Sequence, residues 1–218
     1  MIHLRLGPPR RRLSLLCLGA HSDDIEIGCG GTVLSLLAAY PRATVRWVVF
    51  SAAGRRGGEA RRAATRFLRA AAGADVALHE FRDGFFPNEQ ARIKETFEEL
   101  KTGAPPDLIL THYGNDRHQD HRVISELTWN TFRDHWILEY EVPKYDGDLG
   151  QPNVFVPLRP SVRRRKVALL MSSFGSQRSK RWFTPATFDG LMRLRGVESA
   201  APDGYAEAFH SRKATLGV

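Results

Sequence analysis

Short apolar segments alternate with helix-like segments along the first 135 residues of this chain, and this alternation constrains the fold more than any other feature. The apolar segments have the length of buried strands, and the segments between them carry apolar residues at helical spacing. A strand followed by a helix, repeated four times, favours right-handed crossovers and parallel strands. We therefore expect a Rossmann-like α/β fold, with a mostly parallel sheet and helices on both faces. The predicted strands are 13–18, 44–50, 75–81 and 108–111, and the predicted helices are 32–40, 59–72, 88–101 and 121–133, with a polar loop at 21–26 and a glycine-rich stretch at 28–31 before the first helix.

The pattern becomes less regular beyond about residue 138. The predicted strands there are 139–142, 154–156 and 205–209, the predicted helices are 163–173 and 186–194, and 143–152 is a turn-rich loop. A chain of 218 residues is near the size of one large domain. We therefore expect a single domain over residues 1–218, with a Rossmann-like core at 13–135 and a C-terminal, substrate-side extension at 136–218.

Cysteine content and hydropathy indicate the compartment. Cys17 and Cys29 are too few for a disulfide framework and form no Cys-x-x-Cys pair, so we expect buried, reduced thiols. No apolar run approaches the ~18 residues that a membrane-spanning helix needs, and the chain does not begin with a signal-peptide core. These features predict a cytoplasmic protein without a membrane span.

The chain is basic: 32 Lys and Arg against 24 Asp and Glu give a net charge of +8, which raises the question of a polyanionic partner. The basic tracts are 10–12, 55–56, 61–62 and 163–166. A nucleic-acid-binding chain is expected to interleave such residues with aromatics on one face, or to carry a known binding motif, and the sequence shows neither. We expect scattered, solvated arginines and no nucleic-acid partner, with an anionic substrate or surface as the alternative.

Polar side chains follow the first and fourth predicted strands directly. The first segment contains Ala20-His21-Ser22-Asp23-Asp24, and the second ends in His118-Gln119-Asp120-His121. If the two strands are neighbours, their carboxyl ends bring both segments to the edge where open sheets bind ligands. A divalent cation removes the repulsion between nearby carboxylates. His21, Asp24 and His121 are therefore candidate ligands of a catalytic Zn²⁺ with open positions for water, although Fe²⁺ or another divalent metal fits the same set.

The remaining polar residues of these segments suit amide hydrolysis. Asp23 is a candidate general base that deprotonates a metal-bound water. His118 is a candidate for stabilising the oxyanion as an imidazolium and protonating the leaving amine. Asp120 is a candidate for holding His118 in the required tautomer and raising its pKa. Each of the two motifs alone is common. If the first motif had no functional role, Asp23 and Asp24 would simply cap the helix that follows. The presence of both motifs, each after a strand of one sheet, favours a catalytic role.

These segments resemble the signature of the LmbE-like, or PIG-L-like, N-acetylglucosaminyl deacetylases, which is Ala-His-Pro-Asp-Asp in the first loop and His-x-Asp-His in the fourth. The similarity extends from about residue 13 to 123 and includes the glycines of 28–31. Ser22 replaces the proline of the family, which removes a rigid φ but no ligand. Asp116 stands where some relatives carry a tyrosine that assists at the transition state, so this assistance is not expected here.

The resemblance implies a zinc-dependent deacetylase on a Rossmann-like fold. By position, it assigns His21, Asp24 and His121 as metal ligands, Asp23 as the base and His118 as the acid or oxyanion residue. It further implies that Arg56, in Arg56-Gly57-Gly58-Glu59, contacts the sugar and that Asp83 binds sugar hydroxyls.

The expected function is the removal of an acetyl group from an N-acetylated amino sugar on a small, possibly anionic, glycoconjugate. One alternative keeps the metal site but acts as an amidase or esterase on thiol or antibiotic conjugates. Another is a non-catalytic, polyanion-binding protein on a Rossmann-like sheet. A homo-oligomer is compatible with all three functions.

Overall fold

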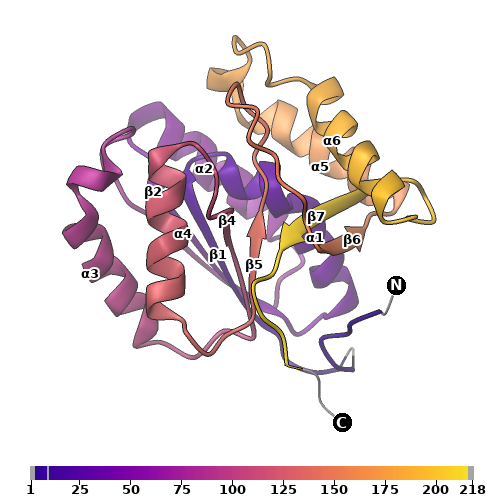
Figure 1. Cartoon of the computed structure of the whole chain (residues 1–218), viewed down its shortest axis with the longest axis horizontal. Coiled ribbons are helices and arrows are strands. Elements are labelled where there is room, and N and C mark those ends of the chain that lie inside the picture. Colours follow the sequence, from indigo (N-terminus) through magenta and orange to yellow (C-terminus); the bar gives the residue numbers. More distant parts are fainter. Residues whose placement is uncertain (1–2, 9, 216–218) are drawn as a thin grey trace.

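The computed structural model describes residues 3–8 and 10–215, and Figure 1 shows its helices and strands. In chain order they are β1 (Ser14–His21), α1 (Asp24–Ala39), β2 (Thr44–Ser51), α2 (Gly54–Phe67), β3 (Gly73–Leu78), η1 (Phe86–Asn88), α3 (Gln90–Lys101), β4 (Leu108–His112), α4 (Gln119–Thr131), β5 (Ile137–Tyr140), β6 (Val154–Pro157), α5 (Pro160–Ser173), η2 (Gly175–Gln177), α6 (Pro185–Glu198) and β7 (Ala206–His210).

The strands of the described residues form one sheet in the order β3-β2-β1-β4-β5-β7-β6. The five strands from β3 to β5 pair in parallel, and β7 runs antiparallel to both β5 and β6. β1 lies at the centre of these five parallel strands, with Leu15 opposite Val45 of β2 and Leu108 of β4. The predicted α/β fold with a mostly parallel sheet is therefore confirmed, and the first and fourth predicted strands are neighbours.

Side chains that alternate along the strands form a core on each face of the sheet. In β1, Leu15 and Cys17 face a cluster that includes residues of α1, α2, α5 and α6. Leu16 and Leu18 face the opposite way, toward a cluster that includes residues of α3 and α4. In Figure 1, α4 lies in front of the sheet. Helices thus cover both faces, and the polar edge where the parallel strands end remains available for a site.

Helix α1 begins at Asp24, so the prediction of a loop and a glycine-rich connection before residue 32 was wrong. The helix is buried on all sides from Asp24 to Leu34. Its glycines serve close packing: a Cβ on Gly28 would lie 2.1 Å from Cδ2 of Tyr140, and one on Gly30 would lie 2.6 Å from Cε1 of Phe67. These glycines therefore permit contact with distant residues, at the expense of helix propensity.

The other predicted elements are present with shifted ends. The largest shift is in α2, which starts at Gly54 and ends at Phe67, so that Gly73 opens β3 instead of following a helix. The segment 143–152 connects β5 to β6 as an irregular loop. Cys17 and Cys29 are buried free thiols, as expected. Within the described residues, no helix combines the length and the apolar character needed to span a bilayer.

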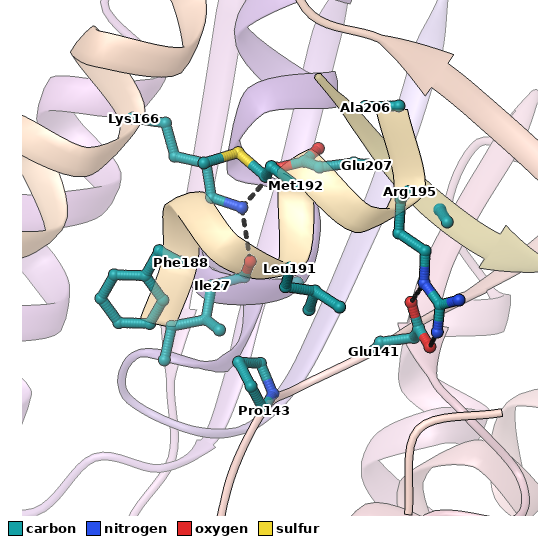
Figure 2. A pocket seen from close by; sticks show the side chains of 12 residues that line it. Ile27, Glu141, Pro143, Lys166, Phe188, Leu191, Met192, Arg195, Ala206 and Glu207 are labelled. Carbon is teal, nitrogen blue, oxygen red and sulfur yellow. Dashed lines mark hydrogen bonds and ion pairs between the residues drawn. The ribbon is translucent and has the colours of Figure 1, made fainter. Parts of the chain in front are cut away.

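A buried ion pair ties the C-terminal part to α1 (Figure 2). Nζ of Lys166, on α5, lies 2.5 Å from Oε1 of Glu207, on β7, and donates to the carbonyl of Ile27 at 2.6 Å. The Glu207 carboxylate accepts hydrogen bonds from the backbone N–H groups of Gly31 at 2.8 Å and Thr32 at 2.6 Å. Side chains from the extension thus bond to the backbone of α1 midway along the helix.

Candidate active site

The candidate site lies where β1 and β4 end. His21 is the last residue of β1, and α1 opens shortly after it, at Asp24. His118 is the N-cap of α4, and His121 lies in the first turn of that helix. The rings of His21 and His121 are 5.2 Å apart between centroids. The two polar segments that the sequence singled out therefore converge at one edge of the sheet.

Three potential ligand atoms form a nearly equilateral triangle. Nδ1 of His21 lies 3.2 Å from Nε2 of His121 and 3.3 Å from Oδ2 of Asp24, and the third side, from His121 to Asp24, is 3.5 Å. A tetrahedral zinc ion with bonds of about 2.0–2.2 Å separates its ligand atoms by about 3.3–3.6 Å. All three side chains are buried. The triangle thus fits a metal ion held by three residues.

The charges around the triangle favour a cation. Burial alone would raise the pKa of Asp24, but His121 and His21 outweigh it and hold this pKa well below its usual value. Burial lowers the pKa of His121 to about 4, so the imidazole is neutral at pH 7, as a metal ligand must be. Burial also lowers the pKa of His21, but Asp24 and a hydrogen bond to Asp120 outweigh it and raise this pKa well above normal. A metal ion at Nδ1 would take the place of that proton.

Two further groups of ligand-type atoms overlap the triangle. One consists of His21, Asp83, His118 and Asp120, and the other of His112, Asp116 and His121. Their carboxylates hydrogen-bond the ligand histidines, Asp120 to His21 and Asp116 to His121, which is the arrangement of residues that orient metal ligands. Nε2 of His112 accepts the N–H of Ala20 at 2.9 Å, so this nitrogen is engaged. The triangle of His21, Asp24 and His121 is therefore the candidate metal site that the two carboxylates support.

Asp23 is buried beside the triangle. Burial and the neighbouring Asp24 raise the pKa of Asp23 to about 6, although Arg56, whose Nη2 lies 4.0 Å from Oδ1 of Asp23, opposes the rise. A carboxyl group with this pKa is mostly ionised at pH 7 and is more basic than an ordinary carboxylate. These properties suit the general-base role that we expect for Asp23.

His118 packs against both histidines of the triangle, with its ring centroid 4.8 Å from that of His21 and 4.6 Å from that of His121. Its Nδ1 accepts a hydrogen bond from the backbone N–H of Asp120 at 3.3 Å. The proton of the neutral ring is therefore on Nε2. Burial and His21 lower the pKa of His118, which favours the neutral ring; the imidazolium role expected from the sequence stays a prediction. A neutral ring still donates an N–H to an oxyanion.

The carboxylate of Asp120 lies within 4.8 Å of a ring nitrogen of His118 but hydrogen-bonds other partners. Its Oδ2 lies 3.2 Å from Nε2 of His21 and accepts the N–H of Gly84 at 2.6 Å, while Oδ1 accepts the N–H of Phe86 at 3.1 Å. Asp120 thus orients His21, and it bonds to His118 through its backbone.

Arg56 and Asp83 line the cavity at the site, which has a volume of about 260 Å³. Nη1 of Arg56 lies 2.6 Å from Oδ2 of Asp83, and Oδ1 of Asp83 lies 3.1 Å from Nε2 of His21. A sugar that contacts both residues must therefore share or replace their ion pair. The full lining is His21, Asp23, Asp24, Arg56, Asp83, His118, His121, Val142, Lys144, Tyr145, Asp146, Lys180 and Trp182.

The sequence analysis did not find the supporting roles of Asp116 and Lys144. Oδ2 of Asp116 lies 2.9 Å from Nδ1 of His121 and 2.9 Å from Nζ of Lys144. Lys144 also pairs with Asp148 at 2.6 Å, which links the 143–152 loop to the site. Asp116 fixes the His121 ring through Nδ1 and leaves Nε2 available for a metal ion. The role of Asp116 could have been inferred from the sequence, because this acidic residue stands shortly before a candidate ligand histidine. The contribution of Lys144 depends on tertiary packing and has no such signal in the sequence.

Comparisons with known proteins give a family and a shared fold. The family profile of PIG-L, described as GlcNAc-PI de-N-acetylase, matches residues 16–132. Similar solved structures include a conserved protein from Thermus thermophilus, with 20% identity over 94% of this chain and 97% of that one and a TM-score of 0.70. They also include GalB, the 4-carboxy-2-hydroxymuconate hydratase of Pseudomonas putida, with 18% identity, 94% and 98% coverage and a TM-score of 0.69. The N,N'-diacetylchitobiose deacetylase from Pyrococcus horikoshii has 16% identity, 91% and 83% coverage and a TM-score of 0.65.

A search of curated proteins gave no significant match. At identities of 20% and below, the solved structures show a common fold and do not transfer an activity. The profile match is stronger evidence for a family, because it covers more than half of the chain and includes both polar segments, from His21 to His121. On this evidence the chain belongs to the PIG-L family.

Proposed function

We propose that this protein is a zinc-dependent hydrolase that removes the acetyl group from an N-acetylated amino sugar on a small glycoconjugate. The observation that carries the proposal is the triangle of His21, Asp24 and His121 beside Asp23 in one cavity. Membership of a family described as a de-N-acetylase supports it. One structure of this fold is a deacetylase and another is a hydratase, so the site and the family support the proposal more than the fold does.

The metal would be held by His21, Asp24 and His121. Two nitrogens and one carboxylate oxygen, with a further position free, are typical of a catalytic zinc site, although Fe²⁺ accepts the same donors. When bound, zinc supplies a Lewis acid that polarises a carbonyl group and lowers the pKa of water. Asp116 and Asp120 orient the two histidines for this purpose.

The chain's own groups supply the proton transfers. Asp23 accepts a proton as water attacks the acetamide carbon. The Nε2–H of His118 hydrogen-bonds the oxygen that becomes negative. The carbon–nitrogen bond then breaks, and Asp23 returns the proton to the leaving nitrogen, so that a free amine and acetate form. We assign this last step to Asp23 and not to His118, because a neutral imidazole is a poor proton source.

The sugar would lie between the Arg56–Asp83 pair and the wall formed by Trp182. Nζ of Lys180 lies 5.5 Å from the ring centroid of Trp182, and both line the cavity. An aromatic ring beside polar groups offers an apolar surface to a sugar ring while the charged pair binds hydroxyls. These residues would set the substrate orientation, with the acetamide directed at the triangle.

Elemental analysis of the purified protein, followed by acetate release from a panel of N-acetylglucosamine conjugates, tests the proposal. Asp23→Ala should retain the metal but lose turnover by a factor of about 10²–10⁴. His21→Ala and His121→Ala should lose the metal. Asp203→Ala, at an exposed acid on the loop before β7, is the matched control and should behave as the wild type. Full turnover by metal-loaded Asp23→Ala protein would contradict the base assignment.

The same panel separates the alternative functions. Acetate release from O-acetyl sugars alone would indicate an esterase, and cleavage of thiol conjugates alone would indicate an amidase of another class. A protein that only binds polyanions would release no acetate, would bind with a steep salt dependence and would be insensitive to Asp23→Ala.

A further inference from the structure

The excess positive charge of this protein is confined to two segments. Residues 53–73, which contain α2, and residues 158–184, which contain α5 and η2, together hold 14 of the 32 Lys and Arg but one of the 24 Asp and Glu. The rest of the chain has 18 basic and 23 acidic residues and is therefore acidic overall. The whole net charge of +8 thus originates in these two segments.

The two segments lie side by side on one face of the molecule. Nη1 of Arg66, on α2, donates to the hydroxyls of Ser172 at 2.8 Å and Ser173 at 3.3 Å, both on α5. The single acid, Glu59, is buried and accepts the N–H of Ser176 at 3.0 Å. The expectation of scattered arginines was therefore wrong: packing of α2 against α5 gathers tracts that are about a hundred residues apart in sequence.

The arginines of this face are exposed and unneutralised. Arg61, Arg62, Arg66, Arg69, Arg164 and Arg165 are all exposed, and none has a carboxylate within ion-pair distance among the residues that the structure describes. Like charges held this close repel one another, and an anion relieves the repulsion. A group of exposed arginines with no acidic residue among them is suited to bind a ligand that carries more than one negative charge.

A groove between α2 and α5 collects three of these groups. It has a volume of about 550 Å³ and is lined by Arg66, Arg69 and Arg165, with Ala70 and Leu169 as its apolar part. The hydroxyls of α5 fix the position of the Arg66 guanidinium. The planar fork of a guanidinium binds two phosphate oxygens at once, which a lysine cannot do. Its lining shares no residue with the catalytic cavity.

We infer that this groove binds a phosphoryl group, supplied either by a soluble phosphate ester or by the headgroup of an acidic lipid. Three guanidinium groups match the charge and the oxygens of one phosphate or pyrophosphate. A single-stranded nucleic acid is less suited, because it needs exposed aromatic rings for base stacking; Phe67 and Phe174 in these segments are buried, and Trp182 lines the catalytic cavity. The inference does not depend on the proposed deacetylation, since the groove lies outside that site.

Titration of the full-length protein with inorganic pyrophosphate, followed by calorimetry at physiological ionic strength, tests this inference. We expect saturation near one equivalent. Arg69→Glu/Arg165→Glu should weaken binding by about tenfold or more, because it removes charged hydrogen-bond donors and introduces repulsion. Lys101→Glu/Arg133→Glu alters the net charge equally on the α3–α4 side and should change the affinity by less than about twofold. Both double variants should retain the wild-type circular dichroism spectrum.

Two further arms identify the source of the phosphate. Sedimentation with phosphatidylcholine vesicles, with and without phosphatidic acid, shows a lipid headgroup if the acidic vesicles bind and pyrophosphate competes. Pyrophosphate binding without vesicle binding indicates a soluble ester. The inference is overturned if pyrophosphate shows no saturable binding or if both double variants lose the same affinity for it. It is also overturned if the protein binds a DNA duplex but does not bind pyrophosphate.

Discussion

Replacement of Lys166 by methionine tests whether the C-terminal elements stabilise the helix that carries the site. Lys166 is 2% exposed and Glu207 is 4% exposed, so water cannot solvate either group. Methionine keeps most of the side-chain volume but removes the charge. The Glu207 carboxylate then stays buried with the N–H groups of Gly31 and Thr32 as its partners, and the carbonyl of Ile27 loses its side-chain donor.

The expected loss follows from the type of interaction. Removal of one partner of a buried ion pair costs about 3–5 kcal/mol, because the other charge remains buried and uncompensated. The whole unfolding free energy of a domain is about 5–15 kcal/mol, so Lys166→Met should remove about a fifth of it or more. Lys166→Met/Glu207→Gln leaves no buried charge and should cost less than the sum of the two single variants.

Urea unfolding at pH 7, followed by circular dichroism, measures these differences. Lys94→Met is the control, because its partner Glu98 is half-exposed and such pairs contribute about 0–1 kcal/mol. A loss below about 1 kcal/mol for Lys166→Met would refute the reasoning. It would mean that α1 keeps its position without the ion pair.

Three further predictions concern the site and α1. Asp116→Ala should weaken zinc affinity by about 10–100-fold, measured by chelator competition, because the ligand histidine loses its orienting carboxylate; an unchanged affinity would contradict this role. Since the raised pKa of Asp23 leaves the carboxylate ionised only above about pH 6, kcat/KM for acetate release should fall about tenfold per pH unit below that value. An acid limb near the ordinary carboxyl pKa, with the metal content constant, would argue against Asp23 as the base. Gly30→Ala should lower stability by about 1–3 kcal/mol because its Cβ meets the ring of Phe67, whereas Gly190→Ala, with open space around it in α6, should stabilise the fold by up to about 1 kcal/mol. Thermal unfolding of the two glycine variants tests whether the first lowers and the second raises the stability of the fold.

The position of the site was predictable because its residues obey a local rule. His21 ends one parallel strand and His121 follows the next strand along the sheet, and parallel strands end at a common edge. That rule needs no knowledge of tertiary contacts beyond strand order. The start of α1 was not predictable in this way, because Gly28 and Gly30 have low helix propensity, and the reason for their presence lies in Tyr140 and Phe67, far away in sequence.

The role of Asp120 and the clustering of arginines on α2 and α5 also depend on contacts between residues that are distant in sequence. Proximity in sequence suggested that Asp120 orients His118, but the first turn of α4 directs its carboxylate to His21, about a hundred residues away. The arginine tracts were recognisable one by one. That they form a single face depends on which helices pack together, and α2 and α5 are joined by contacts such as Arg66 to Ser172 that the pattern of either helix does not contain.

The 143–152 loop has anchors and a tip with different constraints. Lys144 pairs with Asp116, and Asp148 accepts the N–H of Arg117 at 2.7 Å. Between these anchors, Tyr145 is 73% exposed and borders the cavity. Variant libraries restricted to the tip, with both anchors retained, would therefore alter the rim of the cavity while the contact between Asp116 and His121 stays in place.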